Sequence, residues 1–73
     1  MNYNINKAFG SRIADLRKQQ NLSQEDFANK CSLFRTYIGA IERGEKSPTL
    51  NTIEKLAKGL NISITELLKD IQK

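Results

Sequence analysis

Charged side chains are the groups in this chain best able to do chemistry, and the basic ones prevail. Of its 73 residues, 12 are Lys or Arg and 8 are Asp or Glu, which gives a formal net charge of +4. This charge balance is compatible with a nucleic-acid partner but does not establish one. The chain has no His, so it lacks an imidazole base and the common zinc-ligand sets.

The side chains also show none of the arrangements typical of an active site. The sequence has no paired-carboxylate pocket motif, no nucleophile–base pair and no phosphate-binding loop. Cys31 is the single cysteine, and we expect it to be a small core residue in a reducing compartment. No apolar run approaches the roughly 18 residues of a membrane span. We therefore expect a cytoplasmic protein that is not an enzyme and has no cofactor, metal or membrane partner.

The apolar residues are spaced as in helices throughout the chain. This spacing predicts an all-α fold, a compact bundle of five short helices in a single domain over residues 1–73. The first helix is expected over about residues 6–19 and the third over about 35–43. The apolar residues that define the five helices are, in order, Phe9, Ile13 and Leu16; Phe27, Ala28 and Cys31; Ile38 and Ile41; Ile53, Leu56, Ala57 and Leu60; and Leu67, Leu68 and Ile71.

Polar residues mark where these helices begin and end. Ser23 and Ser63 each precede an acidic residue by three positions, the pattern of a capping box in which the Ser oxygen accepts a free backbone N–H. Thr49 is suited to cap the fourth helix. Gly44 and Asn61 supply the left-handed residues that end the third and fourth helices.

Four sequence blocks resemble, in order and spacing, the Cro/cI-type helix-turn-helix family, also called the xenobiotic-response-element family. They are residues 24–28 (QEDFA), 35–38 (RTYI), 41–44 (IERG) and 47–50 (SPTL). The resemblance covers about residues 7–70 and implies a lambda-repressor-like fold that binds double-stranded DNA. Residues 33–43 are also similar to the controller proteins of restriction–modification systems. This similarity implies a transcriptional activator or repressor that acts as a homodimer on a two-fold operator. It further implies that two dimers assemble as a pair on the DNA and that RNA polymerase is another partner.

The resemblance assigns residues 24–43 to two helices joined by a short turn, with the second helix in the major groove. Arg35 would stand at the groove-facing end of that helix, where a guanidinium can bond O6 and N7 of one guanine. Thr36 would place its methyl group against a thymine methyl. The alternatives left open are that Arg35 is a solvated surface residue and that Thr36 only helps to start the helix.

Several neighbouring positions depart from the family or specify little. Ser32 takes a turn position usually held by Gly, so we expect strain or a Ser-specific turn. Phe34 takes a cap position that it cannot fill, and it would pack against a sugar or a thymine methyl, or cover the helix start. Gly39 and Ala40 would lie about one turn beyond Arg35 on the same exposed side and let the helix sit deep in the groove.

Polar residues on both flanks of this helix are implied to hold the DNA backbone. Gln24 would bond a phosphate, unless it is merely a first-turn residue. For Tyr37 two roles stay open: its ring is partly buried, or its hydroxyl reaches a phosphate. The residues implied to contact the backbone on the other flank are Arg43, Lys46, Ser47, Thr49 and Asn51. For Lys46, a solvated loop lysine is the alternative.

A structural ion pair is implied between the first and third helices. Relatives pair the Glu of the IERG block with an Arg of the first helix, which corresponds here to Glu42 and Arg17. Such a pair would hold the third helix in place and would not read DNA.

The last predicted helix carries a wide apolar surface formed by Ile64, Leu67, Leu68 and Ile71. On a helix, the Leu67/Ile71 and Ile64/Leu68 faces point in different directions, so one can meet the core and the other a second copy. This surface, together with the resemblance, predicts a C-terminal dimer interface.

A second function class stays in view beside the regulator. The same fold serves antitoxin-type and phage repressor-type interaction modules, and an antitoxin usually adds a toxin-binding extension. Because the sequence ends at Lys73, soon after the last predicted helix, we expect no such extension and favour the regulator. A stoichiometric protein partner recovered from the host would reverse that order.

Overall fold

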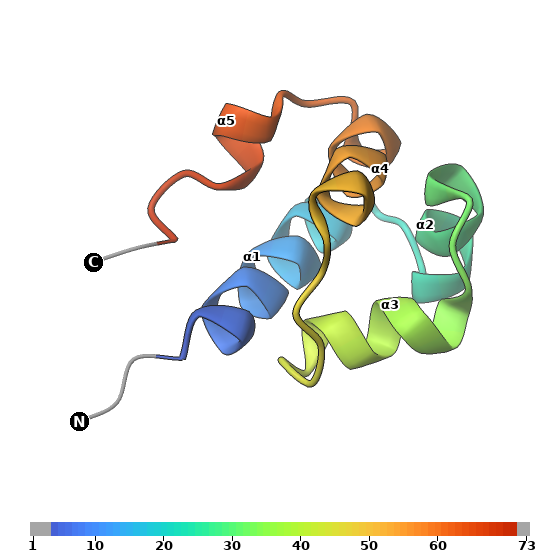
Figure 1. Cartoon of the computed structure of the whole chain (residues 1–73). Helices are drawn as coiled ribbons and strands as arrows, with labels where there is room; N and C mark the ends of the chain where they lie inside the picture. Colours follow the sequence, from blue (N-terminus) through green and yellow to red (C-terminus); the bar gives the residue numbers. More distant parts are fainter. Residues whose placement is uncertain (1–3, 72–73) are drawn as a thin grey trace.

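The computed structural model describes residues 4–71, and this part of the chain contains five helices and no strand (Figure 1). The helices are α1 (Ile5–Gln19), α2 (Gln24–Cys31), α3 (Arg35–Glu42), α4 (Leu50–Leu60) and α5 (Ile64–Leu67). α1 packs against α3, α2 packs against both α3 and α4, and α4 packs against α5. The all-α prediction is confirmed. Residues 1–3 and 72–73 of the predicted domain lie outside the described residues.

The helix starts follow the capping signals of the sequence. Ser23 Oγ accepts a hydrogen bond from the backbone N–H of Asp26 at 3.0 Å, and Ser63 does the same at the start of α5. Thr49 Oγ1 accepts from the backbone N–H of Thr52 at 3.2 Å and so caps α4. Each bond satisfies an N–H group that has no partner within the first turn, a gain of about 1 kcal/mol.

Left-handed residues end α3 and α4, as the sequence predicts. Asn61 has φ 58°, and Gly44, one residue after the C-cap of α3, has φ 79°. A Cβ atom on residue 44 would lie only 2.5 Å from Cγ of Lys7. Gly is therefore required at this position both by its backbone conformation and by the space around it.

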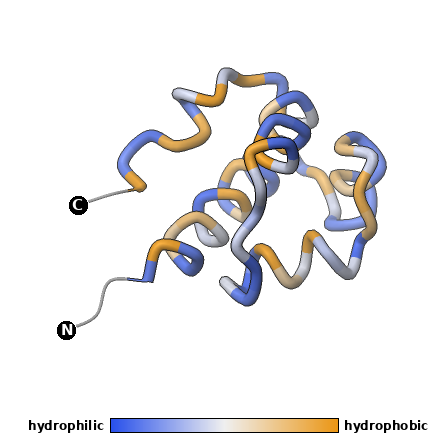
Figure 2. Tube along the Cα trace, in the orientation of Figure 1, coloured by the Kyte–Doolittle hydropathy of each residue, from blue (hydrophilic) through white to orange (hydrophobic). Residues whose placement is uncertain are grey.

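One apolar core joins the five helices, and the predicted core residues of the first four helices line it. The largest fully buried side chains are Ile13, Phe27, Ile38, Ile41, Leu56, Leu60 and Leu67. Figure 2 shows the corresponding pattern along the chain, in which hydrophobic stretches recur at helical intervals between hydrophilic ones. Cys31 is buried in this core with a free thiol, as predicted.

α5 is shorter than the sequence predicts, because it ends at Leu67 and does not continue helically to Ile71. Arg12 of α1 donates from Nη2 to the backbone carbonyl of Glu66 at 2.7 Å and from Nε to that of Leu67 at 3.4 Å. Beyond these carbonyls the chain turns, and Asp70 adopts φ 62°. A contact from the other end of the sequence thus accompanies the end of this helix.

The arrangement separates the two surfaces of interest. α2 and α3 lie at one side of the molecule, on the right in Figure 1, while α5 and both ends of the described chain lie on the left. None of the helices in residues 4–71 combines the length and the apolar character needed to cross a bilayer.

Candidate nucleic-acid interface

The turn between α2 and α3 is tight and uses a left-handed serine. Ser32 has φ 59° and ψ 41°, in the region that Gly usually occupies in such turns. The backbone N–H of Leu33 donates to the carbonyl of Ala28 at 2.9 Å and closes the turn. The predicted strain at Ser32 is therefore present as a positive φ, and the turn sets the angle at which α3 leaves α2.

The first turn of α3 stands free of the core. Ile38 and Ile41 anchor the inner face of the helix and are fully buried, whereas Arg35 and Thr36 are exposed. Phe34 adopts an extended N-cap conformation with no side-chain cap bond, and its side chain is 82% exposed. Phe34 therefore does not cover the helix start, and three unlike side chains are exposed at the N-terminal end of α3.

The middle of α3 is less accessible than the sequence predicts. Ala40 is only 7% exposed and packs inward, so the expectation that it faces the groove is wrong. Gly39 is also buried, because the side chains of Arg43 and Gln24 lie over it. No local pattern in the sequence indicates that an arginine one turn later folds back over this position.

A buried ion pair ties α1 to α3, as the resemblance implied. Arg17 donates from Nε to Oε2 of Glu42 at 2.7 Å and from Nη2 to Oε1 at 3.1 Å. Arg17 Nη1 also donates to the backbone carbonyl of Leu22 at 2.8 Å, just before α2. The pair therefore links three segments around the C-terminal end of α3.

Gln24 is held by the same pair. Its side chain is half-buried, and Nε2 donates to Oε1 of Glu42 at 2.9 Å. This bond fixes the amide group, with one N–H directed at Glu42 and a second N–H left over. Gln24 therefore occupies a defined position beside α3 and is more than a solvated first-turn residue.

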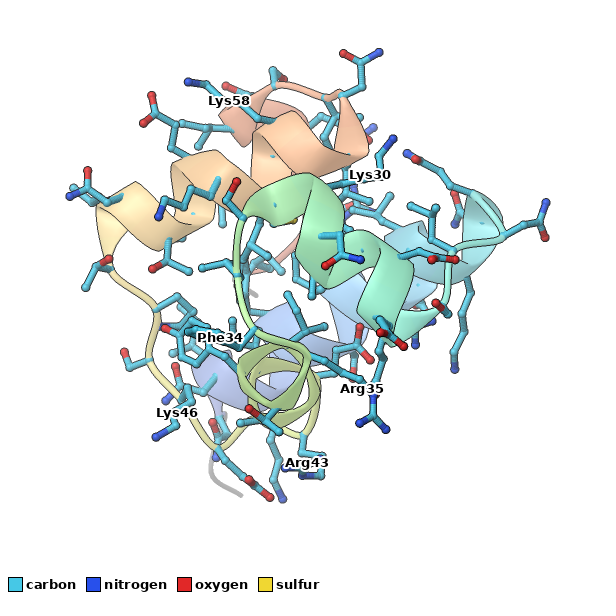
Figure 3. All side chains as sticks on the ribbon, turned by 90° about the vertical axis from the view of Figure 1, so that its right-hand side faces the viewer. Lys30, Phe34, Arg35, Arg43, Lys46 and Lys58 are labelled. Carbon is cyan, nitrogen blue, oxygen red and sulfur yellow. The ribbon has the colours of Figure 1, made fainter. Side chains whose placement is uncertain are left out.

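Arg43 lies on a different flank from the one predicted for it from the sequence. A Cβ atom on residue 39 would lie 3.1 Å from Nη1 of Arg43 and 3.8 Å from Oε1 of Gln24, so both side chains border the same space. The assignment of Arg43 to the flank opposite Gln24 is wrong. In Figure 3, which looks nearly along α3, Lys46 and Arg35 lie on opposite sides of the helix and Arg43 lies below it.

Glu45 was not expected to take part in this surface, yet it contacts Arg43 directly. Arg43 donates from Nε to Oε2 of Glu45 at 2.9 Å and from Nη2 to Oε1 at 3.1 Å. The hydrogen bond and the charge of Glu45 raise the pKa of Arg43, and the hydrogen bond from Arg43 lowers the pKa of Glu45. Both side chains are exposed, so the pair is accessible to solvent and to a binding partner.

The loop before α4 and the first turn of α4 present further polar groups. Lys46, Ser47 and Asn51 are exposed, as contact with a DNA backbone requires. The hydroxyl of Thr49 is exposed but is already engaged, since it caps α4 and also donates to Oγ1 of Thr52 at 3.2 Å. Tyr37 is half-buried, with its ring packed against the core.

The predicted dimer surface divides into two parts. Leu67 and Ile71 are buried in the core of the single chain, so their assignment as contacts to a second copy is wrong. Ile64 is 44% exposed and Leu68 is 38% exposed, and these two remain accessible. The expectation that one face meets the core while the other points outward is therefore correct.

Two long-range contacts of α1 had no signal in the sequence. Arg12 binds the last turn of α5 and also contacts Oε2 of Glu66 at 3.0 Å. Gln20 donates from Nε2 to the backbone carbonyl of Leu60 at 2.8 Å, at the end of α4. Both side chains satisfy carbonyl groups at helix ends, and they fix where α4 and α5 sit relative to α1.

Comparison with known proteins gives consistent results over nearly the whole chain. A helix-turn-helix family model matches residues 13–67. Control protein C.MunI of a Mycoplasma species is 44% identical over 66 residues, which are 89% of each chain. Control protein C.BamHI of Bacillus amyloliquefaciens is 42% identical over 69 residues, 93% of this chain and 85% of that protein. The crystal structure of the restriction–modification controller protein C.AhdI from Aeromonas hydrophila superposes with a TM-score of 0.83 at 42% identity, covering 85% of this chain and 94% of that one.

Proposed function

The chain belongs to the helix-turn-helix family of DNA-binding transcriptional regulators, and from this premise we propose that it controls a restriction–modification operon as a homodimer. Membership of this family makes it a regulator and not an enzyme. The observation that carries the proposal is the free first turn of α3, where Phe34, Arg35 and Thr36 project from a helix anchored by buried isoleucines.

We assign base recognition to this end of α3. Arg35 reads a guanine through O6 and N7, and Thr36 contacts a thymine methyl. Phe34 contacts an apolar edge, a sugar or a thymine methyl, because its ring is exposed at the tip of the helix. Ala40 has no part in this recognition, since it packs inward.

The backbone contacts surround this reading end. Gln24 and Arg43 border the same space over Gly39, while Lys46 and Ser47 lie in the loop before α4 and Asn51 lies in the first turn of α4. Thr49 and Tyr37 add hydroxyl groups to this set. Such contacts position the helix and supply affinity for any duplex, while the base contacts supply the sequence preference.

Dimerisation is assigned to the surface formed by α5 and the start of α1. Ile64, Leu68 and Ile5 are exposed there, and Ile5 and Leu68 line a shallow, mainly apolar groove of about 180 Å³ that extends to Ser47 in the loop before α4. A second copy that covers this surface about a two-fold axis would place two α3 helices about 34 Å apart, one turn of DNA. Residues 1–73 would then form one DNA-binding unit with a C-terminal dimer contact.

The wider proposal concerns the setting of this dimer. It works in the cytoplasm on the operon that contains its own gene, dimers assemble in pairs on neighbouring sites, and RNA polymerase is the enzyme that they recruit or exclude. Similarity to proteins named as restriction–modification controllers supports the choice of operon.

Selection of binding sites from random duplexes, followed by footprinting, tests the proposal. The expected result is a two-fold symmetric site whose half-sites are about 10 base pairs apart. Each half-site should contain a guanine that the protein protects from methylation and that Arg35→Ala leaves unprotected. Recovery of a stoichiometric protein partner, with no selected sequence, would instead favour the antitoxin-type module.

A further inference from the structure

We propose that Gln24 and Arg43 bind one and the same DNA phosphate. The two side chains form a cradle over Gly39, whose lack of a side chain leaves room for them. The inference rests on the proposed function and deepens it, because it joins two contacts that the sequence placed on separate flanks. The ligand is a single phosphodiester group of the duplex lying along α3.

The space over Gly39 is where the two donors meet. A Cβ atom on residue 39 would lie 3.1 Å from Nη1 of Arg43 and between 3.8 and 3.9 Å from the amide oxygen and nitrogen of Gln24. The first of these distances is too short for comfortable packing, so the absence of a side chain lets the guanidinium lie against the helix. Arg43, the C-cap of α3, and Gln24, the first residue of α2, thus border the same space over Gly39.

Glu42 orients the amide group of Gln24 in the cradle. Its Oε1 accepts one N–H of the Gln24 amide at 2.9 Å, which directs the amide nitrogen toward α3 and leaves its second N–H for another acceptor. The negative charge of Glu42 is balanced by Arg17, which contacts both carboxylate oxygens. A phosphate beside Gln24 therefore meets an oriented donor, and the carboxylate behind it is neutralised.

Glu45 competes with a phosphate for the guanidinium of Arg43, but it occupies only one edge of that group. It engages Nε and Nη2 of the guanidinium and leaves Nη1, the nitrogen that lies over Gly39, without a hydrogen-bond partner among the described residues. Both members of this pair are exposed, so a DNA backbone can reach the free edge. The two remaining donors, Nη1 of Arg43 and Nε2 of Gln24, suit an anion with several acceptor oxygens in a fixed geometry, as a phosphodiester has.

A double-mutant cycle on operator binding tests the shared phosphate. Gln24→Ala, Arg43→Ala and the double variant are compared with the unchanged protein at one salt concentration. If both side chains hold one phosphate, the loss of affinity in the double variant should fall short of the product of the single losses by at least about threefold. The matched control is Gln24→Ala with Lys46→Ala, whose losses should multiply because Lys46 belongs to the loop before α4 and lies on the side of α3 away from Arg35 (Figure 3).

Gly39→Ala tests the cradle without destabilising the fold. Ala is favoured over Gly in a helix, so the melting temperature should hold or rise. Operator affinity should fall, and the coupling between Gln24 and Arg43 should disappear in this background, because the new methyl group displaces Nη1 of Arg43. Full coupling in the Gly39→Ala background, or multiplying losses in the original cycle, would overturn the cradle while leaving the regulator intact. An unchanged protein that binds no duplex would overturn the proposed function and the cradle together.

Discussion

Replacing Glu42 with Ala is expected to destabilise the fold sharply, because it leaves the positive charge of Arg17 buried without its partner. The side chains of Arg17 and Glu42 are 11% and 7% exposed, and both carboxylate oxygens receive hydrogen bonds from the guanidinium. The substitution would leave Arg17 only the carbonyl of Leu22, and it would also remove the acceptor of the Gln24 amide.

The size of the effect follows from this burial. Removing one partner of a buried pair costs about 3–5 kcal/mol. A chain of 73 residues has a total stability of about 4–11 kcal/mol at about 0.05–0.15 kcal/mol per residue, so the loss is a large share of it. In a domain of this size each kcal/mol lowers the melting temperature by about 4–8 °C, which predicts a fall of roughly 12 °C or more.

Thermal unfolding followed by circular dichroism measures this fall, and two variants serve as controls. Glu45→Ala breaks an exposed pair and should shift the melting temperature by only a few degrees. Arg17→Met with Glu42→Leu removes both charges and should recover most of the stability, since no lone charge stays buried. A Glu42→Ala melting temperature within a degree or two of the unchanged protein would refute the reasoning. A double variant as unstable as the single one would refute the claim that the unpaired, buried charge of Arg17 causes the loss of stability.

Three further predictions concern other parts of the molecule. Leu68→Glu should convert the dimer to a monomer of 8.3 kDa in sedimentation and weaken operator binding without unfolding the chain, whereas an unchanged protein that already sediments as a monomer would contradict the dimer surface. Glu45→Gln should raise the affinity for every duplex and steepen its salt dependence, because Arg43 then faces phosphate without a competing carboxylate; equal or weaker binding would contradict this role. Burial raises the pKa of the Cys31 thiol from 9.0 to about 11, with a small opposing effect of Lys30. The unfolded thiol therefore ionises first, and chemical denaturation should show stability falling between about pH 9 and 11 more steeply than in Cys31→Ala; parallel pH profiles would count against the shift.

The parts of the fold that could be predicted are those set by neighbours in sequence. Ser23, Thr49 and Ser63 cap their helices as the local pattern indicates, because a capping bond spans only three residues. Asn61 and Gly44 end helices for the same local reason. The end of α5 could not be predicted, since it coincides with carbonyl groups that bind Arg12, more than fifty residues earlier.

The same distinction applies to the candidate site. The exposed end of α3 follows from the spacing of Ile38 and Ile41, which fixes the side of the helix that faces the core. The burial of Gly39 does not follow, because it depends on the rotamer of Arg43 and on the position of Gln24 in another helix. Helical spacing alone identifies a face, but long side chains decide which parts of that face remain open.

The central claim is that Arg35 reads sequence from the free first turn of α3, and Arg35→Ala tests it most directly. The measurement is the ratio of operator affinity to affinity for an unrelated duplex, both at the same salt concentration. Loss of a guanine contact costs about 1–3 kcal/mol per half-site, so the ratio should fall by at least about thirtyfold for a dimer on two half-sites. Affinity for the unrelated duplex should change little, because the phosphate contacts stay in place. A variant that keeps the original ratio would contradict the assignment of Arg35 to base recognition.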